Sequence, residues 1–223
     1  MGKLYVVATP IGNMEDISNR ALRTISEADL ILCEDTRQTQ KILDRYGIKK
    51  PTLSYHQHSK LGKVEEIIEM LKDGKILAMV SDAGTPGISD PGNLLVSKVS
   101  EALKETEIIP IPGPSALAAA VSISGFPMDK FSFMGFPPVK KRRNKFFEEV
   151  ADSKYPIVFY ESPYRIRKAL AELPRDREIV VCRELTKKFE SVYRGTVEEV
   201  AKLIEKSDPR GEFVVILGGK SKV

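Results

Sequence analysis

The sequence predicts an α/β protein made of two α/β domains. Short apolar runs typical of buried strands recur along the chain, and many are separated by segments with apolar residues at i, i+3 and i+4 spacing. That spacing is typical of helices that bury one face, and its alternation with strands indicates α/β architecture. The length of 223 residues fits one large domain or two domains of about 110 residues each.

Strands are expected where apolar residues follow one another, and helices where they repeat with helical spacing. A further helix pattern of small residues, SALAAAVSIS, begins at Ser115. The expected strands are residues 4–8, 30–33, 76–80, 108–111, 157–160, 179–182 and 213–217. The expected helices are residues 19–27, 37–46, 63–72, 94–104, 166–173 and 197–205.

The expected domain boundary is the turn IPIPGP, in which prolines surround Gly113. We therefore expect an N-terminal α/β domain of residues 1–114 and a C-terminal α/β domain of residues 115–223. Two domains of this kind would leave a cleft between them. Binding loops in such folds gather at the carboxyl ends of the strands.

The composition is that of a soluble globular protein, with 42% hydrophobic residues, 30% charged residues and a net charge of +4. No apolar stretch approaches the roughly 18 residues that span a bilayer, and no signal peptide is recognised, so a cytoplasmic protein is expected, with neither membrane nor DNA as partner. Cys33 and Cys182 lie in separate apolar runs and are expected to be reduced core residues. His56 and His58, the only histidines, have no cysteine near them in the sequence, and no metal site is expected.

The segment VSDAGTPGISDPG, residues 80–92, predicts a binding loop. It follows an apolar run and places three glycines and two prolines around Asp82 and Asp90. Glycine permits close backbone approach, proline fixes its own φ, and aspartate accepts hydrogen bonds from hydroxyls or cationic groups. The alternative is an elaborate surface turn, although ordinary strand-to-helix loops have only about 2 to 6 residues.

The segment CEDTR places two carboxylates and an arginine at the end of the second expected strand. In an α/β fold this is a position for site residues. The alternative is that Asp35 or Thr36 caps the next helix while Glu34 and Arg37 form an ion pair. Capping and catalysis are compatible.

Two more loops of the first half follow strands. The first, ATPIGNMEDIS, is no dinucleotide fingerprint because Gly12 stands alone, and the P-loop lysine signature is also missing. The second, IPIPGPSALAAA, begins a helix at Ser115 and Ala116. Exposed amides and small side chains there would accept a flat heterocycle or a polar ligand edge; close helix packing is the competing explanation.

Charged side chains also follow two strands of the second half, in FYESPYR and CRELTKKFE. A single charged residue is more often surface decoration, but two such loops after consecutive strands favour a site. The candidates are Glu161, Ser162, Arg165, Arg183, Glu184, Lys187 and Glu190.

A basic cluster follows the proline pair at 137–138, and phenylalanines precede it. Cations attract phosphates, and aromatic rings suit unstacked RNA bases. A solvated helix start is the alternative for the cations, and a place in the core is favoured slightly for the rings. The residues are Lys140, Lys141, Arg142, Arg143 and Lys145, with Phe131, Phe133 and Phe136.

In order, the motifs ATPIGN, CEDTR, VSDAGTPGISDPG, IPGPSAL, GFP with GFPP, YESPYR, RELTKKFE and RG with GEFVVI closely resemble those of bacterial small-subunit ribosomal RNA (cytidine-2′-O)-methyltransferases, within the tetrapyrrole methylase superfamily. The resemblance covers residues 4–217. It implies two α/β domains of the tetrapyrrole methylase type, S-adenosylmethionine in the cleft between them, and a homodimer. It also implies a cytidine in the decoding region of 16S rRNA as substrate, on the assembled small subunit.

The resemblance also implies site residues by matching motifs. The implied contacts to S-adenosylmethionine are Pro10, Asp82, Thr85, Ser115, Ala116, Tyr160 and Leu185. Phosphate or RNA contacts are expected from Arg37, Arg165 and Arg183 together with Lys140, Lys141, Arg142, Arg143 and Lys145.

The methyl group of a sulfonium is already activated, so the enzyme must mainly align a ribose 2′-oxygen with it, helped by a base that receives the proton. The candidates for that base are Glu34, Asp35, Glu161, Lys187 and Glu190, with Asp35 and Lys187 as the favoured pair. Two other functions stay open: methylation of a tetrapyrrole precursor, and a ribosome-assembly or ligand-sensing factor without turnover. The first loop, TPIGN, favours the RNA branch.

Overall fold

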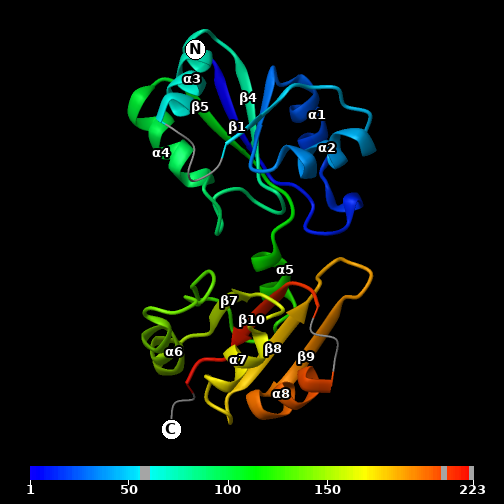
Figure 1. Ribbon diagram of the computed structural model, residues 1–223, viewed down its shortest axis with the longest axis vertical. Coiled ribbons are helices and arrows are strands. Elements are labelled where there is room, and N and C mark those ends of the chain that lie inside the picture. The colour runs from blue at the N-terminus through cyan, green and yellow to red at the C-terminus, as the bar shows by residue number, and fades with distance from the viewer. Residues whose placement is uncertain (56–60, 207–209, 221–223) are drawn as a thin grey trace. The chain divides into compact units, whose positions relative to one another are not determined.

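The computed structural model describes residues 1–55, 61–206 and 210–220, and it shows two compact units, Met1–Ser115 and Ala116–Val223 (Figure 1). Each unit consists of one five-stranded sheet with helices packed on it. Within the described ranges no helix is both long enough and apolar enough to cross a membrane.

The first unit contains a fully parallel sheet in the order β3-β2-β4-β1-β5. The central strand β1 pairs with β4 and β5, so that Lys3 lies opposite both Ile76 and Glu107. Because all five strands run in one direction, their carboxyl ends meet at one edge. The strands are β1 (Lys3–Val7), β2 (Leu30–Cys33), β3 (Thr52–Ser54), β4 (Ile76–Val80) and β5 (Glu107–Ile111).

Helices cover both faces of this sheet (Figure 1). Alternate strand residues face opposite sides: Ala78 and Val80 pack with α1 and α2, whereas Leu77 and Met79 pack with α3 and α4. A strand buried on both faces must be apolar throughout, which explains the continuous run in β4. The helical elements are η1 (Met14–Asp16), α1 (Asn19–Glu27), α2 (Thr36–Arg45), α3 (Leu61–Lys72) and α4 (Gly92–Ala102).

The second unit contains a mixed sheet in the order β6-β7-β10-β8-β9. Only β6 and β7 are parallel; β10 runs antiparallel to β7 and β8, and β9 runs antiparallel to β8. The ends of β6, β7 and β8 and the start of β10 therefore share one edge. The strands are β6 (Ser132–Phe133), β7 (Ile157–Glu161), β8 (Glu178–Arg183), β9 (Ser191–Thr196) and β10 (Phe213–Leu217).

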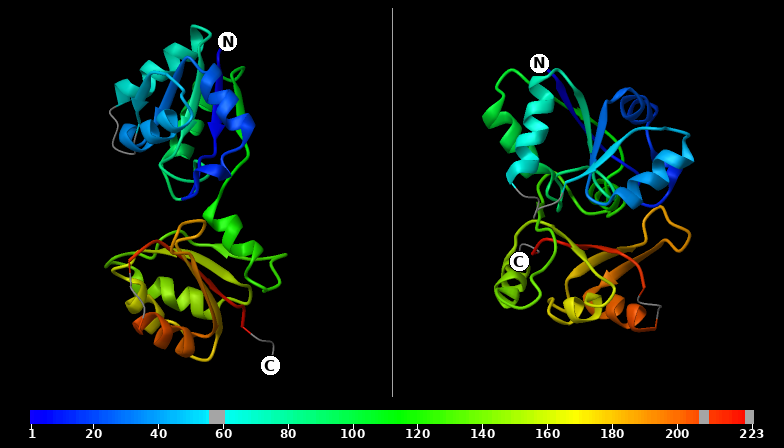
Figure 2. Two further views of the ribbon diagram at one scale, coloured as in Figure 1. Left: turned by 90° about the vertical axis from the view of Figure 1, so that its right-hand side faces the viewer. Right: turned by 45° about the horizontal axis from the view of Figure 1, so that its top comes forward.

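The core of the second unit lies between this sheet and α6, α7 and α8. Phe159, Val181 and Val215 point into it and are fully buried. The helix α5 contacts β10. Within the second unit it lies on the face of the sheet opposite to the other three helices (Figure 2). The helices are α5 (Ala116–Ser122), α6 (Arg143–Asp152), α7 (Ile166–Ala171) and α8 (Val197–Lys206).

All expected strands and amphipathic helices are present, with ends that shift by at most two residues. The strands β3, β6 and β9 were not expected, and the helix α6 was anticipated only as the alternative of a helix start at the basic cluster. The first two are short, with three and two residues. The strand β9 has the mixed sequence SVYRGT and no fully buried residue, so no apolar run marks it.

Candidate functional site

The loops after β1 and β4 are paired with each other at the carboxyl edge of the first sheet. The backbone amide of Thr9 donates to the carbonyl of Gly84 at 2.9 Å, and the amide of Gly84 donates to the carbonyl of Thr9 at 3.0 Å. The Thr9 hydroxyl, which is fully buried, donates to the carbonyl of Ser81 at 3.2 Å. Because buried backbone groups need partners, this bridge sets the two loops in one arrangement.

The turn after β5 joins the same structure. The Thr85 hydroxyl donates to the carbonyl of Pro114 at 3.0 Å, and a Cβ atom at Gly113 would lie 3.0 Å from that of Ala8. The glycine therefore lets the turn approach the end of β1. Thr85 and Ser115, two of the implied cofactor contacts, belong to this assembly, as does the buried Pro10; Ala116 begins α5 of the second unit.

The loop after β2 is attached through Asp82. Its Oδ1 atom accepts from the backbone amide of Asp35 at 3.0 Å. Loops that follow β1, β2, β4 and β5 thus form one connected edge. The site loops of the first half were expected at the carboxyl ends of their strands, and the parallel sheet brings these ends to one edge.

Asp35 is the N-cap of α2, which confirms the capping alternative. Its carboxylate accepts from the amide of Arg37 at 2.9 Å and forms a bidentate ion pair with the Arg37 guanidinium at 3.0 and 2.6 Å. These side-chain hydrogen bonds lower the pKa of Asp35 to about 2. A carboxylate with such a low pKa is a weak base, so the structure does not favour Asp35 as proton acceptor. The alternative of an ion pair between Glu34 and Arg37 is wrong, because Arg37 pairs with Asp35.

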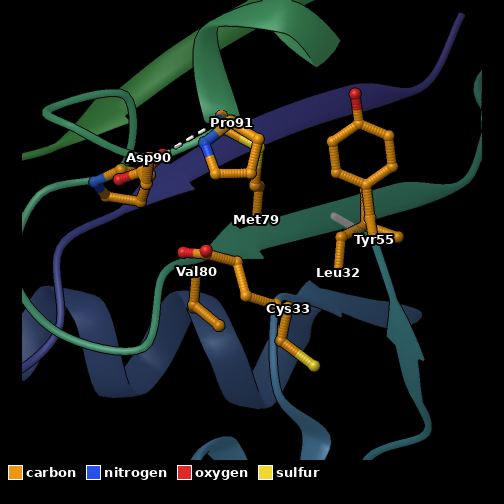
Figure 3. A pocket seen from close by; sticks show the side chains of 10 residues that line it. Leu32, Cys33, Tyr55, Met79, Val80, Asp90 and Pro91 are labelled. Carbon is orange, nitrogen blue, oxygen red and sulfur yellow. Dashed lines mark hydrogen bonds between the residues drawn. The ribbon is translucent and has the colours of Figure 1, made fainter. Parts of the chain in front are cut away.

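Glu34 lies half-buried beside a small pocket between the ends of β2 and β4 (Figure 3). Burial raises the pKa of Glu34, and the carboxylates of Asp90 and Asp82 raise it further. The cavity volume is about 10 Å³, comparable with the space for one water molecule. Its lining includes Leu32, Cys33, Glu34, Tyr55, Met79, Val80, Pro86, Asp90, Pro91 and Gly92.

Of these lining residues only Glu34 was among the proposed site residues; Asp90 and Tyr55 are two of those that were not. Asp90 accepts from the amides of Gly87 and Gly92, both at 2.7 Å, and so holds the turn that leads into α4. Tyr55 is buried and follows β3. The aspartate was visible in the motif at 80–92, but the place of Tyr55 depends on the short strand β3, which no apolar run indicates.

Glu161 was a candidate base, but its surroundings do not favour that role. It is 1% exposed, and its Oε1 atom accepts from the amide of Ser162 at 2.8 Å and forms an ion pair with Arg165 Nε at 3.0 Å. Its Oε2 atom lies 3.9 Å from Arg143 Nη1. Glu161 therefore belongs to a buried charge cluster that holds the loop after β7.

Arg143 was expected to contact RNA, but its guanidinium already has partners within the protein. The residue is 3% exposed; its Nη2 atom lies 2.6 Å from Glu172, and its Nη1 atom donates to the carbonyl of Pro138 at 3.1 Å. Arg165 likewise donates to the carbonyl of Pro137 at 3.3 Å. Both arginines thus hold the proline pair. Of the basic cluster, Lys140, Lys141, Arg142 and Lys145 are exposed.

Lys187 does not fit a proton-accepting role. Its ammonium lies 2.9 Å from Glu184 and 2.8 Å from Glu212. Burial lowers the pKa of Lys187, but the hydrogen bonds to Glu212 and Glu184 outweigh burial and leave it above the usual value. A lysine in this setting keeps its proton.

The loop after β8 holds Leu185 in a constrained backbone. Leu185 is buried, and its two neighbours, Glu184 and Thr186, have φ values of 50° and 65°. Such left-handed conformations are uncommon for non-glycine residues and are often found at functional sites. Glu190 accepts from the amide of Thr186 at 2.5 Å, while Arg183 donates to the carbonyl of Arg210 at 2.7 Å.

The expected core position of the phenylalanines is wrong, because none of the three belongs to the buried core. Phe131 is 38% and Phe136 51% exposed, and neither belongs to the core of the second unit. Phe133 is half-buried, and its ring centroid lies 4.9 Å from that of Tyr160. Burial raises the pKa of Tyr160, which keeps its hydroxyl neutral.

Both cysteines are buried and free, as expected. Burial raises the pKa of Cys33 and raises that of Cys182 to about 11. His56 and His58 lie outside the described residues. Among the residues that the structure does describe, no group of three or more His, Cys, Asp or Glu side chains is arranged to hold a metal ion.

Comparisons of the whole sequence with known protein families and with curated proteins all find methyltransferases. The family model Tetrapyrrole (Corrin/Porphyrin) Methylases matches residues 3–201. The Thermotoga maritima protein named Ribosomal RNA small subunit methyltransferase I is 48% identical over 223 residues, covering 99% of this chain and 100% of the relative. The protein of the same name from Halalkalibacterium halodurans is 44% identical over 226 residues, covering 99% of this chain and 77% of the relative.

Solved structures support the fold. Diphthine synthase aligns with a TM-score of 0.72 at 16% identity, over 97% of this chain and 90% of the other. The methyltransferase CobJ aligns with a TM-score of 0.69 at 22% identity, over 100% and 97%. Identities this low show a shared fold alone.

Gly84 lies in the paired loops after β1 and β4. We predict that Gly84→Ala lowers the free energy of unfolding more than Gly74→Ala does. Both glycines have a φ of +83°, but a Cβ atom at Gly84 would lie 3.3 Å from Ile11 Cγ2, whereas nothing lies within 4 Å at Gly74. Each substitution should cost about 1–2 kcal/mol for the backbone conformation, and Gly84→Ala should cost more. Urea unfolding measures both; equal losses would contradict the crowding at Gly84.

The buried charge cluster predicts that Glu161→Ala is strongly destabilising. Removal of one partner from a buried ion pair typically costs about 3–5 kcal/mol, because the remaining charges lose their compensation. Glu198→Ala is the control, since Glu198 forms an exposed pair with Lys202 and such pairs contribute about 0–1 kcal/mol. Denaturant unfolding of both variants would contradict the assignment if the two losses were alike.

Proposed function

Because the chain belongs to the ribosomal RNA small subunit methyltransferase I family, within the tetrapyrrole methylases, we propose that it methylates the ribose 2′-oxygen of a cytidine in 16S rRNA. S-adenosylmethionine is the proposed methyl donor, and the assembled small ribosomal subunit, at its decoding region, is the proposed substrate. The observation that carries this proposal is the 48% identity over 99% of the chain. A homodimer stays a prediction from the family resemblance.

The connected edge of the first sheet has suitable chemistry for the methyl donor. The donor carries a sulfonium and an ammonium, and the carboxylates of Glu34 and Asp82 lie at this edge. We propose that Asp82, Thr85 and Ser115 bind the donor, with Pro10 beside them in the buried first loop. Ala116, Tyr160 and Leu185 are the proposed contacts in the second unit.

The donor supplies a methyl group that is already activated by the positive sulfur. The protein must then align the ribose oxygen with that methyl group, and alignment is worth up to about 7 to 11 kcal/mol in favourable cases. The same oxygen must lose its proton. Glu34 is the proposed acceptor, because burial and two neighbouring carboxylates raise its pKa and make it a better base than Asp35.

Phosphate binding is proposed for the exposed cations of the second unit. Lys140, Lys141, Arg142 and Lys145 are exposed and follow a proline pair that Arg143 and Arg165 hold in place. A fixed starting point gives these cations a defined position toward the phosphates of RNA. Arg37 and Arg183 remain proposed phosphate contacts, although each already has a partner within the protein.

Transfer of radiolabelled methyl from S-adenosylmethionine tests the activity. The acceptors are small ribosomal subunits that lack the modification, free 16S rRNA and a tetrapyrrole precursor. We expect label on small subunits, recovered as 2′-O-methylcytidine after digestion. Label in the tetrapyrrole alone would move the protein to that branch of the family, and absence of label from every acceptor would contradict an enzymatic role.

The pH dependence of turnover tests Glu34. Since the pKa of Glu34 is raised, its active ionised form is lost at a higher pH than for an ordinary glutamate, which titrates near about 4.3. Turnover should therefore fall on acidification, and the midpoint of this acidic limb should lie at a higher pH than the usual glutamate pKa. Glu34→Gln should lower turnover by about 10²- to 10⁴-fold and abolish the limb.

Asp35→Asn is the matched control for this experiment, because asparagine also caps helices and the pKa of Asp35, about 2, lies below the tested range. The variant should keep the acidic limb. Stability provides a second readout: a raised carboxyl pKa makes the protein less stable as pH rises through it. Glu34→Gln should therefore gain stability relative to the parent at neutral pH and lose that advantage below the usual glutamate pKa.

A further inference from the structure

Three exposed aromatic side chains lie on loops at one edge of the second sheet. Phe136 follows β6, Tyr164 follows β7, and Phe189 lies between β8 and β9. The strands β6, β7 and β8 all run in the same direction, because β6 is parallel to β7 and both β7 and β8 are antiparallel to β10. The three loops therefore leave the sheet at the same edge. The loop between β8 and β9 extends beyond the sheet (Figure 1, orange).

These side chains are far more exposed than large apolar groups usually are. Tyr164 is 96%, Phe189 65% and Phe136 51% exposed. A single exposed apolar side chain needs no explanation, but three on loops at one edge of a sheet favour a binding surface. We refer to Phe136, Tyr164 and Phe189 as the aromatic edge.

Phe136 is held in position by its neighbours. Its ring centroid lies 5.4 Å from that of Tyr160, which in turn lies 4.9 Å from that of Phe133. The following proline pair is fixed by hydrogen bonds from Arg143 and Arg165. A ring that is already fixed loses little conformational entropy on binding.

Cations accompany the aromatic edge. The exposed residues Lys140, Lys141 and Arg142 come shortly after Phe136, and the ammonium of Lys188 lies 5.5 Å from the ring centroid of Phe189. Aromatic faces interleaved with cations are the arrangement by which proteins bind single-stranded nucleic acid, because the bases stack while the phosphates pair with the cations.

We propose that the aromatic edge binds unpaired nucleotides of the RNA substrate, with bases stacked on Phe136, Tyr164 and Phe189. The proposal rests on the proposed function for the identity of the nucleic acid. Double-stranded RNA hides its base faces, so the edge should prefer single strands. A second copy of the chain fits less well, since a two-fold contact through this surface would bring its cations against themselves.

The chain offers a matched control at the opposite edge of the same sheet. Tyr155, which precedes β7, is 49% exposed, and the ammonium of Lys130 lies 5.8 Å from its ring centroid. This pair resembles Phe189 and Lys188 in exposure and in cation distance. It differs in the edge of the sheet at which it lies.

The test is equilibrium binding of a fluorescent single-stranded RNA of about 12 nucleotides to the full chain, by anisotropy, at several salt concentrations. Phe136→Ala, Tyr164→Ala and Phe189→Ala should each weaken binding by about five- to 150-fold, from about 1–3 kcal/mol per stacked base. The salt dependence should stay unchanged, since no cation is lost. Tyr155→Ala should bind as the parent does, and a strand with abasic sites should lose the difference between parent and variants.

Three results would overturn the proposal: equal losses for Tyr155→Ala and the edge variants, tighter binding of a duplex of the same sequence, or a fall in molecular mass by sedimentation when the edge is substituted. The last result would make the surface a contact between copies. Methyl transfer is measured separately on the same proteins. Binding through the edge without methylation would contradict the proposed function alone, and methylation with unaffected RNA binding by the edge variants would contradict this inference alone.

Discussion

The paired backbone hydrogen bonds between Thr9 and Gly84 are the interaction on which the candidate site depends. Strands of a parallel sheet deliver their loops to one edge, but the loops still need partners for their buried backbone groups. Thr9 and Gly84 satisfy each other, Thr85 binds the turn at Pro114, and Asp82 binds the loop after β2. The candidate ligand-binding groups are therefore fixed before any ligand is present.

The second unit uses a different means to the same end. There, buried charge rather than backbone pairing holds the loops. Glu161 lies between Arg143 and Arg165, and both arginines also bind the carbonyls of the proline pair. A buried carboxylate requires such compensation, so Glu161, a candidate base by sequence, holds the loop after β7.

Much of the fold could be predicted from local pattern. Continuous apolar runs identified β2, β4 and β10 at the residues observed, since strands buried on both faces must be apolar throughout. The amphipathic spacing at 19–27 identified α1, because a helix that buries one face repeats its apolar residues with helical spacing. The edge strand β9 could not be found in this way, because its residues are only half-buried.

The candidate site could be predicted in part. Glycine, proline and aspartate located the loop at 80–92, because that composition has few other uses. The roles of individual charges could not be read, because a charge takes its role from its partners. Arg142 is exposed whereas its neighbour Arg143 is buried, and the difference comes from the partners of Arg143, which include Glu161 and Glu172.

The central position of β1 has a consequence for synthesis of the chain. This strand is made long before either of its neighbours, since Lys3 pairs with Ile76 and Glu107. At about 5–20 residues per second, β4 follows after roughly 4 to 15 seconds. During that interval the apolar residues of β1 have no place in a sheet. In the nascent chain β1 therefore stays unpaired until β4 has been synthesised. By contrast, β8 and β9 are consecutive strands, so their pairing needs no later part of the chain.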